Sequence, residues 1–244
     1  MTLLEHLEEL RKRLFIALIA WVVGAGVAFY FRFELLTWLQ APLPGNLTLH
    51  YFSILEPFVV SMQIAAFFGL VLASPIIGAQ VWGFIAPGLY PEERRWAVPF
   101  IVLTTLAFVA GVVFARFLVL PFALPILLAF LGDAATAVLS IGDFISKMLL
   151  YMAVFGIIFE MPVLGFLLAR LGLIQAAWLR QYRRHAIVAG LLIAAVITPT
   201  GDPFNFALVG VPLVVLYEVS ILVVRLSQRK VERGSKDPEF TSPN

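Results

Sequence analysis

Long apolar runs, separated by short charged or turn-forming segments, constrain this chain more than any other feature of its sequence. Four of them, at about 15–31, 58–84, 96–120 and 144–171, have the length of a helix that crosses a hydrocarbon core of about 30 Å, with 15–31 near the lower limit, and a run at about 204–224 is read as a shorter crossing. A chain that is 61% hydrophobic and 13% charged cannot bury this much apolar surface in one soluble domain. The sequence therefore predicts an all-α polytopic membrane protein.

Two further apolar segments are short, and they decide how many crossings are expected. Residues 186–197 reach only about 18 Å as a helix, yet we count them as a thin crossing. Residues 121–131 are interrupted by Pro125, which favours an interfacial or re-entrant segment over a crossing. The prediction is one domain over residues 1–230 with six transmembrane helices, of which the fifth and sixth are short.

The ends of the chain carry charge beside the apolar runs. Residues 3–14 place leucines at helical spacing, which predicts a short amphipathic helix along the inner membrane surface. The acidic residues among them argue against a cleaved signal peptide. A charged tail at residues 231–244 is expected to be cytoplasmic and disordered, and its last six residues, EFTSPN, are set aside as a candidate cloning remnant.

The distribution of lysine and arginine sets the predicted orientation. Cytoplasmic segments of membrane proteins are enriched in basic residues. With six crossings and the N-terminus inside, only Arg32, Arg116 and Lys147 fall in outer segments, whereas the other basic residues fall in inner ones. This asymmetry favours an N-in, C-in topology, and counting residues 121–131 as a crossing would place the cluster Arg180, Arg183 and Arg184 outside.

Several function classes lack the residues they need. The chain has no cysteine, and His6, His50 and His185 lack metal-ligand spacing, so we predict no metal site. No nucleotide-binding, zinc-protease or serine-nucleophile motif is present, so neither an enzyme nor a cofactor is expected. The basic residues form no continuous stripe, which argues against nucleic acid as a partner.

A segment of mixed charge at residues 84–95, FIAPGLYPEERR, separates two of the apolar runs. Its proline and glycine residues end a helix and open a loop, so Glu92, Glu93, Arg94 and Arg95 should lie at a membrane surface. Arginine is ordinary there, but glutamate gains nothing from an anionic leaflet. The two glutamates therefore suggest a cationic partner.

Glu160 lies inside the fourth predicted span, where a carboxylate costs about 2.5–3.5 kcal/mol. No lysine or arginine is expected at that depth. This leaves two alternatives, a protonated acid bonded to Gln63 or Thr104, or a carboxyl facing a watery groove beside the bend at Pro162. A proton-coupled secondary transporter using Glu160 is the alternative function, although no internal repeat supports it.

Small residues four apart on four of the spans predict close helix packing in lipid. These stripes are Ala20, Gly24 and Ala28; Ala65, Gly69 and Ala73; Ala107, Gly111 and Ala115; and Ala186, Gly190 and Ala194.

Four longer motifs resemble those of TatC, the receptor subunit of the twin-arginine protein translocase. They are HLEELRKRL at 6–14, VWGFIAPGLYPEERR at 81–95, FGIIFEMPV at 155–163 and ITPTGDPF at 197–204. They occur in the order of that family and cover essentially the whole chain. The resemblance implies a receptor that binds twin-arginine signal peptides of folded proteins and recruits TatA- and TatB-type single-span subunits for export driven by the proton-motive force.

The resemblance also implies roles for particular residues. Glu9 and Glu93 match the arginine-binding carboxylates of the family, and Phe84 and Arg11 match other positions of its signal-peptide site. Plainer readings remain open, because Glu9 can pair with Arg13 four residues on and Arg11 can be a positive-inside anchor. Further matches are Glu160, to a mid-membrane glutamate that can face a partner helix, and Asp202, which can equally be a simple turn-former.

The family further implies a location and an assembly. We expect a multi-pass protein of the bacterial cytoplasmic membrane, with both termini in the cytoplasm. It would be embedded in the lipid bilayer as a homo-oligomer within a larger complex. The short fifth and sixth runs would form a thin edge against which TatA and TatB subunits dock.

Overall fold

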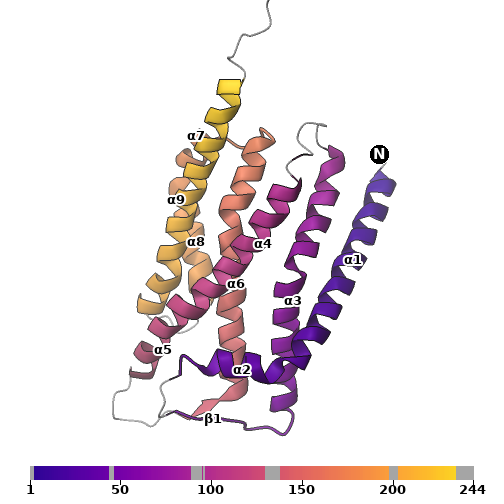
Figure 1. Ribbon diagram of the computed structural model, residues 1–244. Coiled ribbons are helices and arrows are strands. Elements are labelled where there is room, and N and C mark those ends of the chain that lie inside the picture. The colour runs from indigo at the N-terminus through magenta and orange to yellow at the C-terminus, as the bar shows by residue number, and fades with distance from the viewer. Residues whose placement is uncertain are drawn as a thin grey trace, which may run out of the picture. The chain divides into compact units, whose positions relative to one another are not determined.

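The computed structural model of the chain describes residues 3–43, 47–88, 95, 97–129, 138–197 and 203–234. Almost all of them are helical, which confirms the all-α class (Figure 1). The helices are α1 (Leu3–Tyr30), α2 (Arg32–Gln40), α3 (Glu56–Ile85), η1 (Ala86–Gly88), α4 (Ala97–Phe114), the π-helical turn η3 (Ala115–Val119), α5 (Leu120–Ala129), α6 (Ile141–Arg170), α7 (Ala176–Gln181), α8 (Arg183–Ile197) and α9 (Pro203–Gly234). Two strands of two residues each, β1 (Leu49–His50) and β2 (Leu139–Ser140), complete the described elements.

The chain divides into two compact units, Met1–Ile157 and Ile158–Asn244. The first contains α1 to α5 and the beginning of α6, and the second contains the rest of α6 with α7, α8 and α9. The expectation of a single domain over residues 1–230 stays a prediction.

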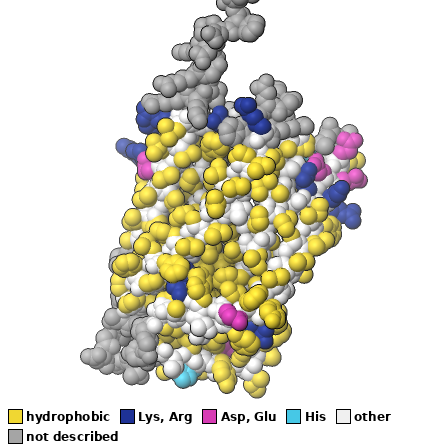
Figure 2. All heavy atoms as spheres, in the orientation of Figure 1, with side chains coloured by type: hydrophobic (Ala, Val, Ile, Leu, Met, Phe, Trp, Pro, Cys, Tyr) yellow, Lys and Arg dark blue, Asp and Glu magenta, His cyan; other side chains and the backbone are white. Residues whose placement is uncertain are grey.

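Within the residues that the structure describes, five helical segments are long and apolar enough to cross a membrane: Leu4–Tyr30, Glu56–Ile85, Ala97–Ile126, Ile141–Arg170 and Phe206–Gln228. Figure 2 shows hydrophobic side chains along the exposed helices, with charged side chains mostly toward the helix ends. Helix α8 has only 15 residues, or about 22 Å, and is short as expected. The expected shortness of the last helix is wrong, because α9 continues to Gly234 through the strong helix formers that follow its apolar run.

The expected break between residues 120 and 121 is also wrong. The third span continues through α4, η3 and α5 as one apolar helix, Ala97–Ile126. At the junction the N–H of Leu120 donates to the carbonyl of Ala115, five residues back, which defines a π-turn. This wider turn gives room to the ring of Pro121, which would otherwise clash with the preceding turn.

The amphipathic N-terminal segment is not a separate helix on the membrane surface, as the sequence suggested. It is the first half of α1, which runs from Leu3 to Tyr30 without interruption. The physical reason is that residues 3–23 contain neither glycine nor proline, so no residue ends the helix before the apolar run begins.

Glycines of the predicted small-residue stripes lie where helix backbones of the first unit meet. A Cβ atom added to Gly69 of α3 would lie 2.4 Å from the backbone nitrogen of Ala25 in α1. One added to Gly111 of α4 would lie 2.3 Å from the carbonyl oxygen of Phe155 in α6. No side chain fits at such separations, so these glycines let the backbones of α1 and α3, and of α4 and α6, touch. Figure 1 shows α1 and α3 running side by side.

A carboxylate links the two strand segments at the β1 end of the first unit. β1 pairs with β2 in parallel, with Leu49 opposite Leu139. The side chain of Glu56, at the start of α3, accepts hydrogen bonds from the Ser140 hydroxyl, the Gly142 N–H at 2.8 Å and the Phe52 N–H at 2.7 Å. The segments before α3 and before α6 are thereby held together.

Arg116, within η3, is a buried cation whose side chain is only 4% exposed. Its Nε and Nη2 atoms donate to the carbonyl of Trp38, at 3.2 and 2.5 Å. That carbonyl lies in the last turn of α2, where cations interact favourably with the helix dipole. The guanidinium also lies 4.8 Å from the centre of the Trp38 ring. Arg116 therefore fastens α2 to the third span.

Side-chain hydrogen bonds from α9 hold α7 and the residues before it in the second unit. The Gln228 side chain accepts from the N–H of Ala176 and donates to the carbonyl of Ile174, and the Tyr217 hydroxyl donates to the carbonyl of Leu179 at 2.8 Å. These bonds connect α9 to α7 and to the residues before it.

Candidate functional site

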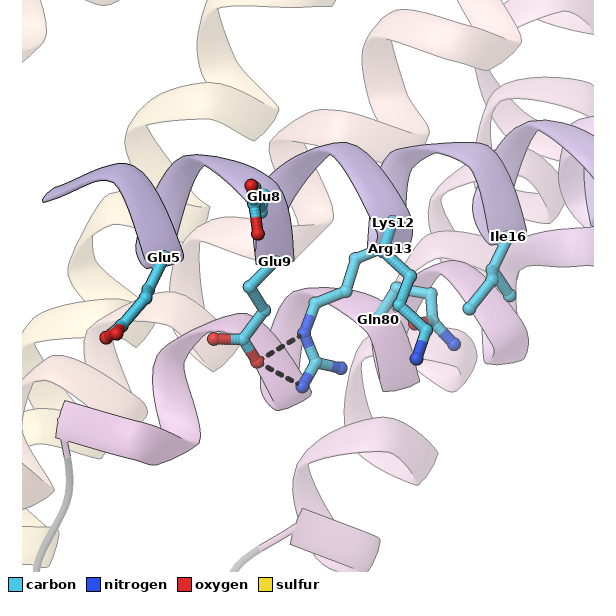
Figure 3. A pocket seen from close by; sticks show the side chains of 7 residues that line it. All are labelled: Glu5, Glu8, Glu9, Lys12, Arg13, Ile16 and Gln80. Carbon is cyan, nitrogen blue, oxygen red and sulfur yellow. Dashed lines mark hydrogen bonds and ion pairs between the residues drawn. The ribbon is translucent and has the colours of Figure 1, made fainter. Parts of the chain in front are cut away.

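A cavity of about 580 Å³ lies beside the first half of α1 in the first unit. Its lining residues are Glu5, Glu8, Glu9, Lys12, Arg13 and Ile16 from α1 and Gln80 from α3 (Figure 3). The α1 residues face the same side because they recur three or four positions apart along the helix. The cavity therefore carries three carboxylates near the N-terminal end of α1, close to the C-terminal half of α3.

Glu9 forms an ion pair with Arg13, one turn further along α1. Two donor atoms of Arg13 bind the same oxygen: Nη2 lies 2.6 Å and Nε 3.0 Å from Oε1 of Glu9. The other oxygen, Oε2, is buried and has no hydrogen-bond partner among the residues that the structure describes. A buried carboxylate oxygen without a donor is costly, so Glu9 has capacity for a further N–H or O–H group.

Gly83 of α3 makes room for this ion pair. A Cβ atom at position 83 would lie 1.9 Å from Nη1 of Arg13 and 2.6 Å from its Cζ atom. The Arg13 guanidinium thus lies against the backbone of α3 at a place where any larger residue would collide with it. This contact joins the cavity side of α1 to the end of α3.

Phe84, the next residue of α3, stacks on His6 of α1. The ring centroids are 4.4 Å apart and the ring planes differ by 22°. The stack holds the start of α1 against the end of α3, immediately before η1. Two of the predicted site residues, Glu9 and Phe84, are therefore brought to the same end of the first unit.

The other predicted residues of the peptide site are placed differently. Arg11 is exposed and does not line the cavity; its guanidinium lies 5.8 Å from the centre of the Phe15 ring on its own helix. Its role in peptide binding stays a prediction. Glu93 follows η1, but it lies outside the described residues, as does Asp202 before α9.

Glu160 lies in the part of α6 that belongs to the second unit. Its Oε2 atom is buried and has no hydrogen-bond partner within the described part of the chain. The partners suggested from the sequence are engaged in the first unit. Gln63 accepts from the Ser146 hydroxyl at 3.1 Å, and the Thr104 hydroxyl donates to the carbonyl of Ile101 at 3.1 Å.

Comparison with known proteins decides the family. A family model described as Sec-independent protein translocase protein (TatC) matches residues 5–212. This chain belongs to the TatC family.

Individual TatC proteins agree with this assignment over nearly their full length. The TatC protein of Deinococcus radiodurans is 42% identical over 231 residues, which cover 92% of this chain and 86% of that protein. The TatC protein of Carboxydothermus hydrogenoformans is 38% identical, covering 97% and 98%. A crystal structure titled Twin Arginine Translocase Receptor- TatC superposes with a TM-score of 0.82 at 39% identity, covering 92% of this chain and all of that one. The resemblance found in the motifs is confirmed, and the chain is a multi-pass membrane protein.

Sequence reasoning missed several residues of this candidate site. The pairing of Glu9 with Arg13 was one of its two readings, because the residues are four apart on a predicted helix. The positions of Gly83 against Arg13 and of Phe84 against His6 carried no signal, since these contacts join segments far apart in the chain. Nothing in the sequence pointed to Gln80 as a lining residue, although the proline and glycine after α3 did indicate where that helix ends.

Proposed function

We propose that this chain is the receptor core of a twin-arginine translocase, which binds the signal peptides of folded cargo proteins. The observation that carries the proposal is the Glu9 carboxylate, which lines an acid-rich cavity and has one buried oxygen without a donor among the described residues. A peptide guanidinium would supply that donor. The similar crystal structure is of a Twin Arginine Translocase Receptor, which supports the same ligand class.

The affinity expected of such a site suits a receptor that must release its ligand. A guanidinium is a rigid fork that matches a carboxylate better than a lysine ammonium does. Hydrogen bonds to charged groups contribute about 1.5–3 kcal/mol each. We propose Glu9 for one peptide arginine and Glu93 for the other, and two such contacts with apolar docking of the peptide correspond to a dissociation constant of roughly micromolar.

Peptide binding tests this proposal directly. The purified protein in detergent is titrated with a labelled twin-arginine signal peptide and, in parallel, with the same peptide carrying Lys-Lys. The expected result is clear preference for Arg-Arg, because only arginine presents a planar fork of donors. Equal affinity for the two peptides would exclude an arginine-specific receptor.

We place both termini in the cytoplasm, with six crossings of the bacterial cytoplasmic membrane and α8 as a thin fifth crossing. Because the sequence contains no cysteine, single cysteines can be added without other changes. Ile54→Cys, at a position 95% exposed before α3, should react with an impermeant maleimide added to intact spheroplasts. Gln181→Cys, at the end of α7, should react only after lysis. Labelling of residue 181 from outside would disprove the topology of six crossings with both termini in the cytoplasm.

We also propose that Glu160 recruits single-span TatA- or TatB-type subunits, whose polar groups would satisfy its buried oxygen, and that α8 lies at their docking edge. Glu160→Ala should then leave peptide binding within about twofold of wild type while impairing export and co-purification of the partner subunits. Glu160→Gln should be milder, because an amide still hydrogen-bonds. Pull-down of tagged partners and export of a reporter measure the effect; normal export by Glu160→Ala would rule this role out.

A further inference from the structure

The hydrogen-bond pattern of the Glu9–Arg13 pair is unusual for an arginine and a carboxylate. A strong pair places two parallel N–H groups on the two oxygens. Here Nε and Nη2 both bind Oε1, at 3.0 and 2.6 Å, and Figure 3 shows the other oxygen turned away from Arg13. Arg13 therefore uses half of the acceptor capacity of Glu9 and leaves Oε2 for another donor.

The pair is also weak enough to exchange. The side chains of Arg13 and Glu9 are 27% and 17% exposed, and the residues are one helical turn apart. Partly exposed pairs of this spacing contribute little to stability, because solvent screens the charges and both long side chains lose freedom. Another guanidinium that can reach both oxygens of Glu9 would form the stronger arrangement.

From these contacts we propose that Arg13 is a resident guanidinium, a residue of the receptor itself that occupies the place of a peptide arginine on Glu9. The inference rests on the proposed function, because it assigns Glu9 to an arginine of the peptide. On binding, the peptide guanidinium takes over Oε1 and also satisfies Oε2, and Arg13 moves away into the open cavity. Arg13 thereby lowers the affinity for the peptide and favours its release.

Gly83 supplies a second, independent way to disturb the pair. A Cβ atom there would lie 1.9 Å from Nη1 of Arg13, and the atom that must yield is the far end of a flexible side chain. Gly83→Ala should therefore push the guanidinium off its position while leaving its charge in the protein. Arg13→Met removes the charge and Gly83→Ala displaces it. Both variants should therefore change the peptide affinity in the same direction.

The test measures the dissociation constant of the twin-arginine peptide for purified variants. Arg13→Met and Gly83→Ala are each expected to tighten binding by about two- to fivefold, the range that a partly exposed ion pair supplies. Gly26→Ala is the matched control, since a Cβ there meets nothing within 4 Å, and it should leave the affinity unchanged. Lys12→Met, in the same cavity, measures the effect of losing one positive charge alone and should tighten binding less than Arg13→Met.

A double-mutant cycle assigns the effect to Glu9. In a Glu9→Gln background, Arg13→Met should no longer tighten binding, because the carboxylate for which Arg13 and the peptide arginine compete is absent. Weaker binding by Arg13→Met, or an unchanged affinity in both Arg13→Met and Gly83→Ala, would overturn the inference while the proposed function stands, provided that wild type prefers Arg-Arg over Lys-Lys. If wild type shows no such preference, both the function and the inference fail. Elution of each variant as one detergent-solubilised species establishes that it is folded.

Discussion

Glu9→Ala should weaken binding of a twin-arginine peptide by about ten- to a hundredfold, the loss expected for a hydrogen-bonded contact between charged groups. The substitution removes the acceptor whose Oε2 atom has no donor among the described residues. It should cost little stability, because the ion pair that it breaks is partly exposed. Glu93→Ala is expected to act similarly if it holds the second arginine. Isothermal titration or fluorescence anisotropy in detergent measures the change.

The control for this prediction separates contact from net charge. Glu34→Ala removes the same charge from an exposed residue of α2 that does not line the cavity, and should change the affinity by less than twofold. The Lys-Lys peptide should lose less affinity than the Arg-Arg peptide when Glu9 is removed, since an ammonium cannot form the paired hydrogen bonds that a guanidinium forms with a carboxylate. If Glu9→Ala binds the Arg-Arg peptide as wild type does, Glu9 is only the helix partner of Arg13.

Gly69→Ala should destabilise the first unit, although it adds a single methyl group. The new carbon would lie 2.4 Å from the backbone nitrogen and 2.6 Å from the Cα atom of Ala25. Backbone atoms cannot rotate away as a side chain does, so α1 and α3 must separate and lose contact along their lengths. Overpacking of this kind costs about 1–3 kcal/mol, occasionally more. The loss is measured as a lowered melting temperature in detergent, by following how much monodisperse protein remains after heating.

Gly26→Ala provides the comparison for Gly69→Ala. Gly26 belongs to α1, one of the same two helices, but a Cβ added there meets nothing within 4 Å. Alanine has a higher helix propensity than glycine, so this variant should be neutral or slightly more stable. Equal melting temperatures for the two variants would mean that α1 and α3 do not depend on the close contact at Gly69.

Periodicity and apolar length predicted the helices of this chain well, because both depend on neighbouring residues. The span at Glu56–Ile85 was expected within two residues at its start, from Pro57, and within one at its end. The small-residue stripes pointed to Gly69 and Gly111 before any contact was known. These features follow from local chemistry, which a single sequence contains.

The errors arose where a local signal was overridden by its surroundings. Pro121 and Pro125 indicated a break, but a π-turn absorbed the first proline and the helix continued. The change from charged to apolar composition near residue 14 suggested two helices, yet nothing in the backbone required a stop. Composition alone shows where a helix leaves the membrane but does not show where it ends.

The candidate site was predictable only in part, since it is made by two helices. The acids of α1 and their spacing were visible, and so was the possible pairing of Glu9 with Arg13. The partner surface was not, because the contacts of Gly83 and Phe84 depend on how α3 crosses α1. A single sequence does not state which residues of two distant segments meet.

The π-turn in the third span has a consequence for the face that this span buries. Its buried residues include a row at every fourth position, Phe100, Thr104, Phe108, Val112, Arg116 and Leu120, beside a second row at Gly111, Ala115, Val119 and Ala123. In a regular α-helix, each step of four residues overshoots a full turn by about 40°, so five such steps would carry the row about 200° around the axis. A π-turn winds less per residue and takes back part of this drift. The row therefore drifts less around the axis after η3 than it would in a regular α-helix, and deleting one residue within Ala115–Val119 would rotate everything after it, with its apolar pattern, by about 100°.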